Sequence, residues 1–397
     1  MSGTSKTQTA QPPRRLRRIL NLDDFEAAAR RHLPRPVFGY ISVAAETNSS
    51  YRRNRDAFAD YEFVPRVLVG VVDRTTRTSL LGQTYDAPFG IAPMGISALS
   101  AYRGDIVQAR AAAQANVPMI LSSSSLIRLE EVIQANPAAW FQAYLAGDQA
   151  GIAAMVDRVA RAGFKTLVVT VDTPANPNKE NYIRTGFSSP LRPSIRLALD
   201  GLTHPRWLIG TFVRTILNYG IPHFENNYAT RGVPIIASNV ERSFADRALL
   251  TWKHFSNIRR IWDGHLVVKG ILHRKDAMIA VDLGADSIIV SNHGGRQLDG
   301  AVSAITVLKD IVDACPNIPV MMDGGVRRGT DVLKALALGA KFVFVGRPFN
   351  YAAAIAGEAG VAYAIDLLKQ EIYRDMAMLG INAPDEIRVD EHIVRRA

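Results

Sequence analysis

Eight short apolar runs, separated by longer segments, constrain the fold of this 397-residue chain more than any other feature. Strands that alternate with helices build parallel sheets, and eight such units predict a (β/α)8 barrel, also called a TIM barrel. The alanine-rich segments that predict helices between them include 105–115, 149–162, 274–283 and 330–338. The runs are Phe89–Ala92, Met119–Leu121, Trp140–Phe141, Leu167–Val171, Leu266–Val268, Ser287–Val290, Val320–Met322 and Phe342–Val345.

A doubly wound open sheet is the alternative architecture. That fold carries a glycine-rich turn after its first strand, whereas residues 91–95 of this chain read IAPMG. With 48% hydrophobic and 21% charged residues, the composition is that of a soluble globular protein, and the length fits one barrel with additions. We therefore expect the barrel.

Polar residues follow nearly every run, at the end of the strand where barrel enzymes build their active sites. They are Ser122, Gln142, Tyr144, Thr170, Asp172, Lys269, Ser291, His293 and Asp323. A polar residue after one strand could arise by chance. Polar residues after nearly every strand predict a single active site at the carboxyl end of the barrel.

The segment 291–299, SNHGGRQLD, is the richest of these strand ends. It holds a potential proton acceptor, His293, and a fixed cation, Arg296, with two glycines between them that let backbone approach a ligand closely. This combination suits a substrate whose carboxylate is clamped while a neighbouring proton is removed. The alternative is a polar loop with a structural histidine and a surface arginine.

The last two strands end in turns that predict a phosphate site. The segment 323–328, DGGVRR, precedes a helix, and Gly346 and Arg347 follow the final strand. Backbone N–H groups and an arginine after strands seven and eight form the usual phosphate site of barrels. Lys269 ends the fifth run, and a phosphate, a flavin or a Schiff-base carbonyl would each explain a lysine there.

The net charge of +10 is concentrated at the N-terminus, because residues 1–20 hold five Lys and Arg and no acid. We see no nucleic-acid motif and expect a flexible arm, with contact to an anionic membrane surface as a second option. A single cysteine, Cys315, excludes an internal disulfide and suits a reducing compartment. No run of residues predicts a signal peptide or a membrane span.

The histidines lack the spacing of metal ligands, so we expect no metal. We expect His32 and His392 to lie on the surface.

The chain divides into the basic tail, 1–20, and one barrel domain, 21–393, that begins with a helix capped by Asn21. About ninety residues separate the fourth and fifth runs, far more than a normal loop, so we expect an insertion at about 175–262. Within it, apolar residues around Trp207 recur at helical spacing. A helix lying on a membrane, a lid over the barrel and an oligomer contact are equally compatible with that pattern.

Several of these segments resemble one known family. Residues 269–270, 291–299, 323–329 and 333–340 are similar to the FMN-dependent L-2-hydroxy acid dehydrogenases and oxidases, which include glycolate oxidase, flavin-type L-lactate dehydrogenase and mandelate dehydrogenase. The SNHGGRQLD stretch is highly specific to that family, and the similarity runs from about residue 21 to about residue 393. The resemblance implies a (β/α)8 fold, FMN as the cofactor and a small 2-hydroxy acid as the substrate.

The resemblance also implies a role for each matching position. His293 matches the catalytic base, Arg296 the arginine that binds the substrate carboxylate, and Asp172 the acid that steadies the protonated imidazole. Lys269 matches the lysine beside flavin N1 and O2. Two tyrosines that contact substrate are matched by Tyr40 and Tyr144, the flavin contacts by Pro93, Met94, Gly95, Ser122, Gln142, Thr170 and Ser291, and the ribityl and phosphate site by Asp323, Gly325, Arg327, Gly346 and Arg347.

Three positions depart from the family pattern. Lys179 stands where many members have a second carboxylate-binding arginine, so the charge survives but the bidentate fork is lost. Ser124 replaces the active-site tryptophan of glycolate oxidase, which opens the pocket to a bulkier substrate. Gly95 stands where several oxidases have alanine, but members of both kinds carry glycine there. Separately, residues 203–207 resemble the membrane-associating insertion of mandelate dehydrogenase.

We therefore expect an FMN-dependent dehydrogenase that oxidises a lactate- or mandelate-like L-2-hydroxy acid and passes electrons to a quinone or another acceptor. Its expected place is the cytoplasm, peripheral at the inner face of the membrane, and family members are often tetramers. The first alternative is a soluble oxidase that produces hydrogen peroxide. The second is an FMN barrel enzyme acting on a different kind of substrate, and a third, a flavin-binding protein without catalysis, fits the intact site residues poorly.

Overall fold

A computed structural model describes residues 13–146, 148–237 and 245–396. Eight parallel strands form one sheet in the order β4-β11-β10-β9-β8-β7-β6-β5. A parallel bridge between Ile91 and Met119 joins the first strand to the last, so the sheet closes into a barrel. The strands are β4 (Phe89–Ile91), β5 (Ile120–Ser122), β6 (Trp140–Ala143), β7 (Thr166–Thr170), β8 (His265–Ile271), β9 (Ser287–Val290), β10 (Val320–Asp323) and β11 (Phe342–Val345). The predicted barrel is confirmed, and each predicted run coincides with one of these strands.

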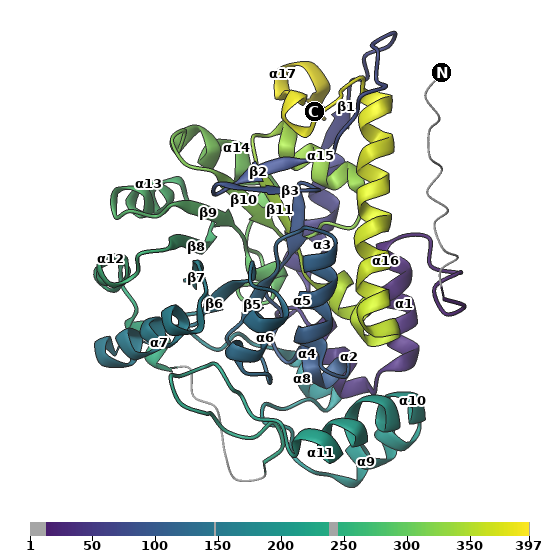
Figure 1. Cartoon of the computed structure of the whole chain (residues 1–397), viewed down its shortest axis with the longest axis vertical. Coiled ribbons are helices and arrows are strands. Elements are labelled where there is room, and N and C mark those ends of the chain that lie inside the picture. The colour runs from purple at the N-terminus through teal and green to yellow at the C-terminus, as the bar shows by residue number, and fades with distance from the viewer. Residues whose placement is uncertain (1–12, 147, 238–244, 397) are drawn as a thin grey trace.

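Helices surround the barrel, and their apolar faces pack on the outward side chains of the strands. Four of them match the predicted segments to within one residue at each end: α5 (Gly104–Gln114), α7 (Gln149–Ala162), α13 (Arg274–Asp282) and α15 (Gly329–Ala337). The others in the ring are α4 (Ser97–Ser100), α6 (Leu129–Ala135), α12 (Trp252–Ile261), α14 (Ala304–Ala314) and α16 (Arg347–Leu379). Among the described helices, α16 alone is long and apolar enough to cross a membrane, and half of its apolar window is buried. It packs against α5 and α1, as Figure 1 shows for α1.

The chain before the barrel covers one side of it. Helix α1 (Leu22–His32) begins as predicted, because the Asn21 side chain accepts hydrogen bonds from the amides of Asp23 and Asp24. Helices α2 (Arg35–Ser42) and α3 (Ser49–Asp56) and the turn η1 (Ala57–Asp60) follow. Residues 1–12 lie outside the described residues, but Leu16 and Ile19 are buried in the core. The predicted tail of residues 1–20 is therefore too long, because its last part packs on the barrel.

The far end of the barrel is closed by a hairpin of β2 (Thr78–Leu80) and β3 (Gln83–Tyr85). Its Leu80 and Tyr85 belong to the apolar cluster that fills the barrel, and the Tyr85 ring packs edge-on against Phe342 at 5.7 Å. Beside it, β1 (Tyr61–Phe63) pairs with β12 (Ile393–Arg395), which follows α17 (Val389–His392). The prediction that His392 lies on the surface is wrong, since it is 2% exposed and its Nδ1 accepts a hydrogen bond from the Arg388 amide.

The segment between β7 and β8 forms a layer at the opposite end from the hairpin (Figure 1). Its helices are α8 (Glu180–Thr185), α9 (Ile195–Leu202), α10 (Pro205–Trp207), the π-helix η2 (Leu208–Val213), α11 (Arg214–Tyr219) and the 3-10 turn η3 (Ala245–Leu249). Helix α12 packs against α7 in the outer ring, so the insertion ends before it rather than at residue 262. Below, "the insertion" means residues 175–250.

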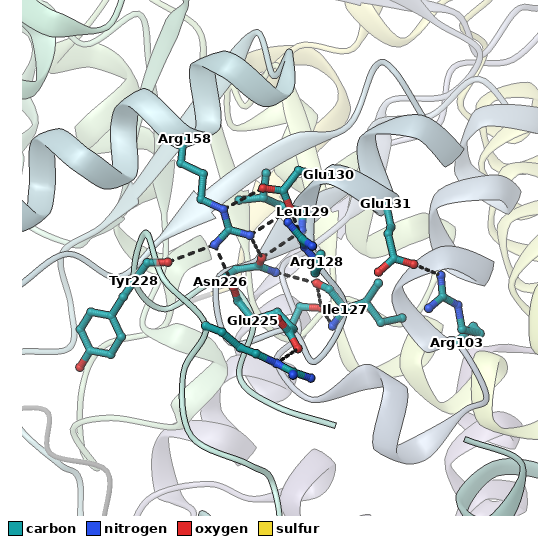
Figure 2. A network of polar contacts seen from close by, with 12 residues as sticks. Arg103, Ile127, Arg128, Leu129, Glu130, Glu131, Arg158, Glu225, Asn226 and Tyr228 are labelled. Carbon is teal, nitrogen blue, oxygen red and sulfur yellow. Dashed lines mark hydrogen bonds and ion pairs between the residues drawn. The ribbon is translucent and has the colours of Figure 1, made fainter. Parts of the chain in front are cut away.

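A polar network ties the insertion to the barrel (Figure 2). Arg158 of α7 forms a paired contact with Glu130 at 2.8 and 2.9 Å and donates to the carbonyls of Glu225 and Tyr228. The Asn226 side chain accepts a hydrogen bond from the Leu129 amide and is itself buried. Burial would raise the pKa of Glu130, but Arg158 outweighs it and holds the pKa at about 2. The segment 225–228 is thereby fixed beside the carboxyl end of β5.

Candidate active site

The two-residue period of the strands explains how polar side chains reach one cavity. Alternate residues of each strand face the inside of the barrel, where the apolar ones form a compact cluster. In six strands the residue two positions after the last inward apolar one is polar and buried. The pairs are Ile120 and Ser122, Trp140 and Gln142, Val168 and Thr170, Val267 and Lys269, Ile289 and Ser291, and Met321 and Asp323.

These side chains line a cavity of about 340 Å³ at the carboxyl end of the barrel. The wall also includes Tyr40 from α2, Lys179 from the insertion and the loop that carries His293. The remaining predicted residues on this wall are Pro93, Met94, Gly95, Ser122, Tyr144, Thr170, Lys269, Arg296, Asp323, Gly325, Arg327, Gly346 and Arg347. Gln142, Asp172 and Ser291 lie directly behind it, bonded to Ser122, His293 and Lys269.

His293 lies between an acid and a phenol. Its Nδ1 is 2.8 Å from Asp172 Oδ1, and its Nε2 is 3.1 Å from the Tyr144 hydroxyl. The carboxylate fixes the tautomer in which Nδ1 carries the proton, which leaves Nε2 as an acceptor facing the cavity. The backbone of His293 has a φ of +59° and its amide donates to Ser291 Oγ, so the turn itself aims the ring.

Gly270 makes room for the acid. A bulge in β8 lies between Lys269 and Ile271, and Gly270 within it has a φ of +104°. A Cβ at this position would lie 2.6 Å from Asp172 Cγ, which is far inside contact distance. The bulge and the missing side chain together allow Asp172 to reach His293.

Burial sets the protonation of this pair. Burial lowers the pKa of His293, and the Asp172 carboxylate opposes this shift only in part, so the pKa of His293 stays below its usual value. Burial alone would raise the pKa of Asp172, but His293 and Lys269 outweigh it and the pKa of Asp172 is lowered. Burial raises the pKa of Tyr144. At neutral pH the site therefore holds a neutral imidazole, a carboxylate and a protonated phenol.

Two cations flank the base. Lys269 is 4% exposed, and its Nζ is 2.7 Å from Asp323 Oδ2 and 2.9 Å from Ser291 Oγ. Arg296 donates to the carbonyls of Tyr40 and Ile41 at 3.1 and 3.0 Å, which fixes its guanidinium plane at the end of α2. A charge held in a fixed plane suits the recognition of a carboxylate.

Aromatic rings cover the Arg296 side of the cavity. Tyr182 of α8 stacks on Tyr40 with ring centroids 6.1 Å apart, and its hydroxyl accepts a hydrogen bond from Arg296 Nη2 at 3.3 Å. The ammonium of Lys179 lies 5.3 Å from the centroid of the same Tyr182 ring. The predicted second cation thus lies in the same group of side chains as Arg296.

Arg347, predicted for the phosphate site, is hydrogen-bonded to the backbone. The Arg347 guanidinium donates to the carbonyls of Ile41, Val43 and Gly294 at 2.7 to 3.1 Å. This side chain therefore joins the end of α2 to the His293 turn. Arg327 also lines this end of the cavity. Gly325 beside it leaves no room for a side chain, since a Cβ would lie 1.9 Å from the Asn54 carbonyl oxygen.

Four buried polar atoms of this region test whether FMN fits. Within the part of the chain that the structure describes, none of them has a hydrogen-bond partner: Gln142 Nε2, Thr170 Oγ1, Asp323 Oδ1 and Arg327 Nη2. Buried polar atoms require partners. The edge of a flavin would supply a partner for Gln142 and Thr170, the ribityl hydroxyls one for Asp323, and the phosphate one for Arg327. The residues therefore fit FMN.

Comparison with known proteins gives the same family. The family model for FMN-dependent dehydrogenases matches residues 29–395. This chain belongs to that family. It is 38% identical over 378 residues to the L-lactate dehydrogenase of Ectopseudomonas mendocina, covering 92% of this chain and 97% of that protein. It is 39% identical over 375 residues to the L-lactate dehydrogenase of a Caulobacter species, covering 93% and 97%.

Solved structures of the family share the fold. The monotopic membrane protein (S)-mandelate dehydrogenase superposes with a TM-score of 0.85 at 33% identity, over 96% of this chain and all of that one. Mandelate oxidase with benzoyl-formic acid gives a TM-score of 0.77 at 34% identity, over 93% and 97%. The family is FMN-dependent, which agrees with the cofactor that the resemblance implied.

Tyr182 and Arg247 are among the residues of the cavity wall that sequence reasoning missed. Arg247 belongs to η3 of the insertion, and its guanidinium lies 4.3 Å from the centroid of the Tyr144 ring. Neither residue follows a strand, so the rule that located the other site residues does not reach them. Tyr182 lies three residues after Lys179 on one helical turn, and that spacing was the available signal.

Proposed function

We propose that this protein oxidises an L-2-hydroxy acid to the 2-oxo acid with FMN and passes the electrons to a quinone-type acceptor at a membrane surface. The observation that carries the proposal is the grouping of His293, Asp172, Arg296 and Lys269 at one mouth of the barrel. A base on a carboxylate beside a fixed guanidinium suits a substrate that has both an acidic group and a removable proton.

Each residue then has a defined task. Arg296 and Lys179 orient the substrate carboxylate from the Tyr182 side. Nε2 of neutral His293 takes the proton, and Asp172 stabilises the imidazolium that results. Tyr144 stays protonated and donates a hydrogen bond toward Nε2 or the substrate oxygen. Tyr40 closes the pocket over the substrate.

The FMN site is proposed on the four partnerless atoms described above. Gln142, Thr170 and Ser122 would hold the flavin ring, with the backbone of Pro93, Met94 and Gly95 along one edge. Asp323, Gly325 and Arg327 would hold the ribityl chain and phosphate, and the backbone of Gly346 and Arg347 would complete that end. FMN supplies the two-electron acceptor for the substrate. Lys269 would place a positive charge beside the ring, since Ser291 and Asp323 hold its ammonium at the centre of the barrel.

The membrane part of the proposal rests on the insertion. We define the apolar face as five side chains on its helices, each more than half exposed: Ile195, Leu199, Leu202, Ile209 and Leu217. Exposed Arg196 and Arg206 lie among them. Apolar side chains with flanking arginines suit an anionic membrane surface. The structural relative described as a monotopic membrane protein supports this part, and the single buried Cys315 favours the cytoplasmic side. A homo-oligomer remains a prediction.

A soluble oxidase is the second candidate, because mandelate oxidase is also a relative in structure. The exposed apolar face favours the dehydrogenase. The rate at which air reoxidises the reduced flavin separates the two, since an oxidase reacts rapidly with oxygen and a quinone-linked dehydrogenase slowly.

The first experiment is anaerobic bleaching of the flavin absorbance by a panel of L-2-hydroxy acids. We expect at least one to reduce the flavin, and we expect His293→Ala to bind FMN but to be reduced at least about a hundredfold more slowly. A yellow protein that no hydroxy acid reduces would contradict the proposed function. An unaffected His293→Ala would contradict the role of the base.

A further inference from the structure

A second cavity, a groove of about 960 Å³, lies between residues 13–15, the end of α1, the insertion and α16. Figure 1 shows α10 of the insertion directly below α1. The groove shares no wall residue with the active-site cavity. Five of its side chains are basic, and in the described part of the chain none of its wall residues is acidic. The basic residues are Arg14, Arg15, His32, Arg206 and Arg214.

The N-terminal wall of the groove is held by the core. Leu16 and Ile19 are buried, and the Tyr363 hydroxyl of α16 donates a hydrogen bond to the Ile19 carbonyl at 3.0 Å. Arg14 and Arg15 directly precede these anchors, and their side chains are exposed. This short basic segment, which the proposed function leaves without a task, is therefore fixed at the rim of the groove.

The insertion wall is held in a similar way. The Trp207 indole is buried and donates to the Leu99 carbonyl at 2.8 Å, which fixes the neighbouring Arg206. The Arg214 guanidinium lies 3.9 Å from the centroid of the Tyr102 ring. An aromatic face attracts a cation but leaves its charge in place. Both arginines thus present positive charge to the groove from backbone that is packed on the barrel.

The half-buried His32 senses the potential inside the groove. Burial lowers the pKa of His32, and three neighbours lower it further: Arg15, Arg206 and His204. Each of these neighbours is basic, so they disfavour an additional proton on the imidazole. A concave wall that concentrates charge of one sign attracts ligands of the opposite sign.

Helix α16 forms the floor of the groove and is interrupted there. Ala356 and Gly357 have non-helical backbone angles, and apart from Ile355 the wall residues of this helix are small. Glu358 follows the break, but it accepts a hydrogen bond from Gln114 at 3.0 Å and is not part of the wall. The floor therefore leaves space for a headgroup and adds no negative charge to the wall.

The groove opens beside the apolar face. Ile209 belongs to both, since it lines the groove and is 66% exposed. A ligand can therefore place a phosphate among the arginines and acyl chains against the apolar face. Paired N–H donors of arginine suit phosphate oxygens, and the adjoining apolar surface favours a lipid over a small soluble anion.

We propose that this groove binds the phosphate of an anionic phospholipid, whose acyl chains lie along Ile209 and the apolar face. The inference rests on the membrane part of the proposed function and names the class of lipid that this part recognises. Phosphatidylcholine also carries a phosphate, but its choline would bring a further cation into a groove that is already positive.

The test uses dihexanoyl-phosphatidylglycerol below its critical micelle concentration, so that no lipid surface is present. Binding to the FMN-loaded protein is measured by isothermal titration calorimetry, and we expect a saturable site. Dihexanoyl-phosphatidylcholine and inorganic phosphate should each bind at least about tenfold more weakly, the first because of its choline and the second because it lacks acyl chains.

The double variant Arg15→Gln/Arg206→Gln should bind dihexanoyl-phosphatidylglycerol about tenfold or more weakly, because both arginines supply charged hydrogen bonds. The matched control is Arg18→Gln/Arg196→Gln. It removes the same charge from the same two segments, and both of its arginines are exposed but do not line the groove. We expect the control to bind like the wild type. Flavin absorbance reports that each variant is folded and loaded.

Three results would overturn the inference: no saturable binding of dihexanoyl-phosphatidylglycerol to the wild type, equal losses in the two double variants, or equally tight binding of inorganic phosphate. The last result would mean that the groove takes a soluble anion. Failure of the membrane part of the proposed function looks different, because the wild-type protein would then not bind anionic vesicles. Failure of this inference alone leaves vesicle binding intact.

Discussion

Asp172 holds His293 by one hydrogen bond of 2.8 Å and also raises its pKa against the effect of burial. Asp172→Asn should therefore lower the pKa of His293 further. Since the base works only when neutral, the acidic limb of kcat/KM against pH should move to lower pH. The plateau should fall about a hundredfold or more, because the imidazolium loses its counter-charge. A limb that moves to higher pH would contradict this account.

Lys179 carries a positive charge but lacks the two parallel N–H donors of an arginine, and its ammonium lies against the Tyr182 ring. If it holds the substrate carboxylate, Lys179→Met should raise KM about tenfold with little change in kcat, and Lys179→Arg should restore it. Steady-state kinetics with the best substrate is the measurement. Equal KM values in all three enzymes would exclude this role.

Most of the residues predicted from sequence are those whose position follows from a strand, whereas Tyr40 and Lys179 were predicted from the family resemblance. His293 and Arg296 lie in one short loop. Lys269 and Asp323 each lie two residues after the last inward-facing apolar residue of their strands. Local spacing was therefore enough to place these four residues in one site. The hydrogen bonds of the Arg347 side chain to the carbonyls of Ile41 and Val43 were not predicted. These two partners are about 300 residues away in sequence, a distance over which a local pattern carries no information.

Among the elements, the β8 bulge is the one on which the catalytic pair most depends. Gly270→Ala would place a Cβ 2.6 Å from Asp172 Cγ on a backbone that disfavours it. We expect the carboxylate to be pushed away from His293 and kcat to fall about tenfold or more while FMN stays bound. Gly300→Ala is the control, because its φ is +81° but a Cβ would meet nothing within 4 Å. Similar loss in both variants would refute a specific effect on Asp172.

The helices of the insertion give the membrane prediction its test. Deleting them would expose the barrel, because Trp207 is buried and donates to the Leu99 carbonyl at 2.8 Å. Changing Leu199, Leu202, Ile209 and Leu217 to Ser keeps the fold and removes several CH₂ groups, each worth about 0.8 kcal/mol when buried in lipid. Binding to anionic vesicles should fall by more than tenfold.

Met378→Ser is the matched control, since Met378 is 74% exposed but lies on α16. Its vesicle binding should equal that of the wild type. Unchanged binding in the quadruple variant would show that this face does not contact lipid. The sequence indicated a helix around Trp207, but not that Trp207 would face the barrel while Ile209 and Leu217 face outward, because both orientations give the same spacing.

For the molecule as a whole, the alternation of runs and helices was sufficient to predict the barrel. It was sufficient because each unit buries its own apolar surface against its neighbours in sequence, as the pairing of β6 with β7 and β7 with β8 illustrates. Features that depend on distant contacts were not predictable. The packing of Leu16 and Ile19 and the burial of His392 are examples.

The β2–β3 hairpin has a consequence for the order of events in turnover. Leu80 and Tyr85 fill the far end of the barrel, so in the described part of the chain the cavity opens on the insertion side. Hydroxy acid and electron acceptor must then approach the flavin by the same route, one after the other. Double-reciprocal plots should give parallel lines, and excess hydroxy acid should inhibit competitively against the acceptor. An enzyme that must empty its site before it can be reoxidised cannot turn over faster than the 2-oxo acid departs.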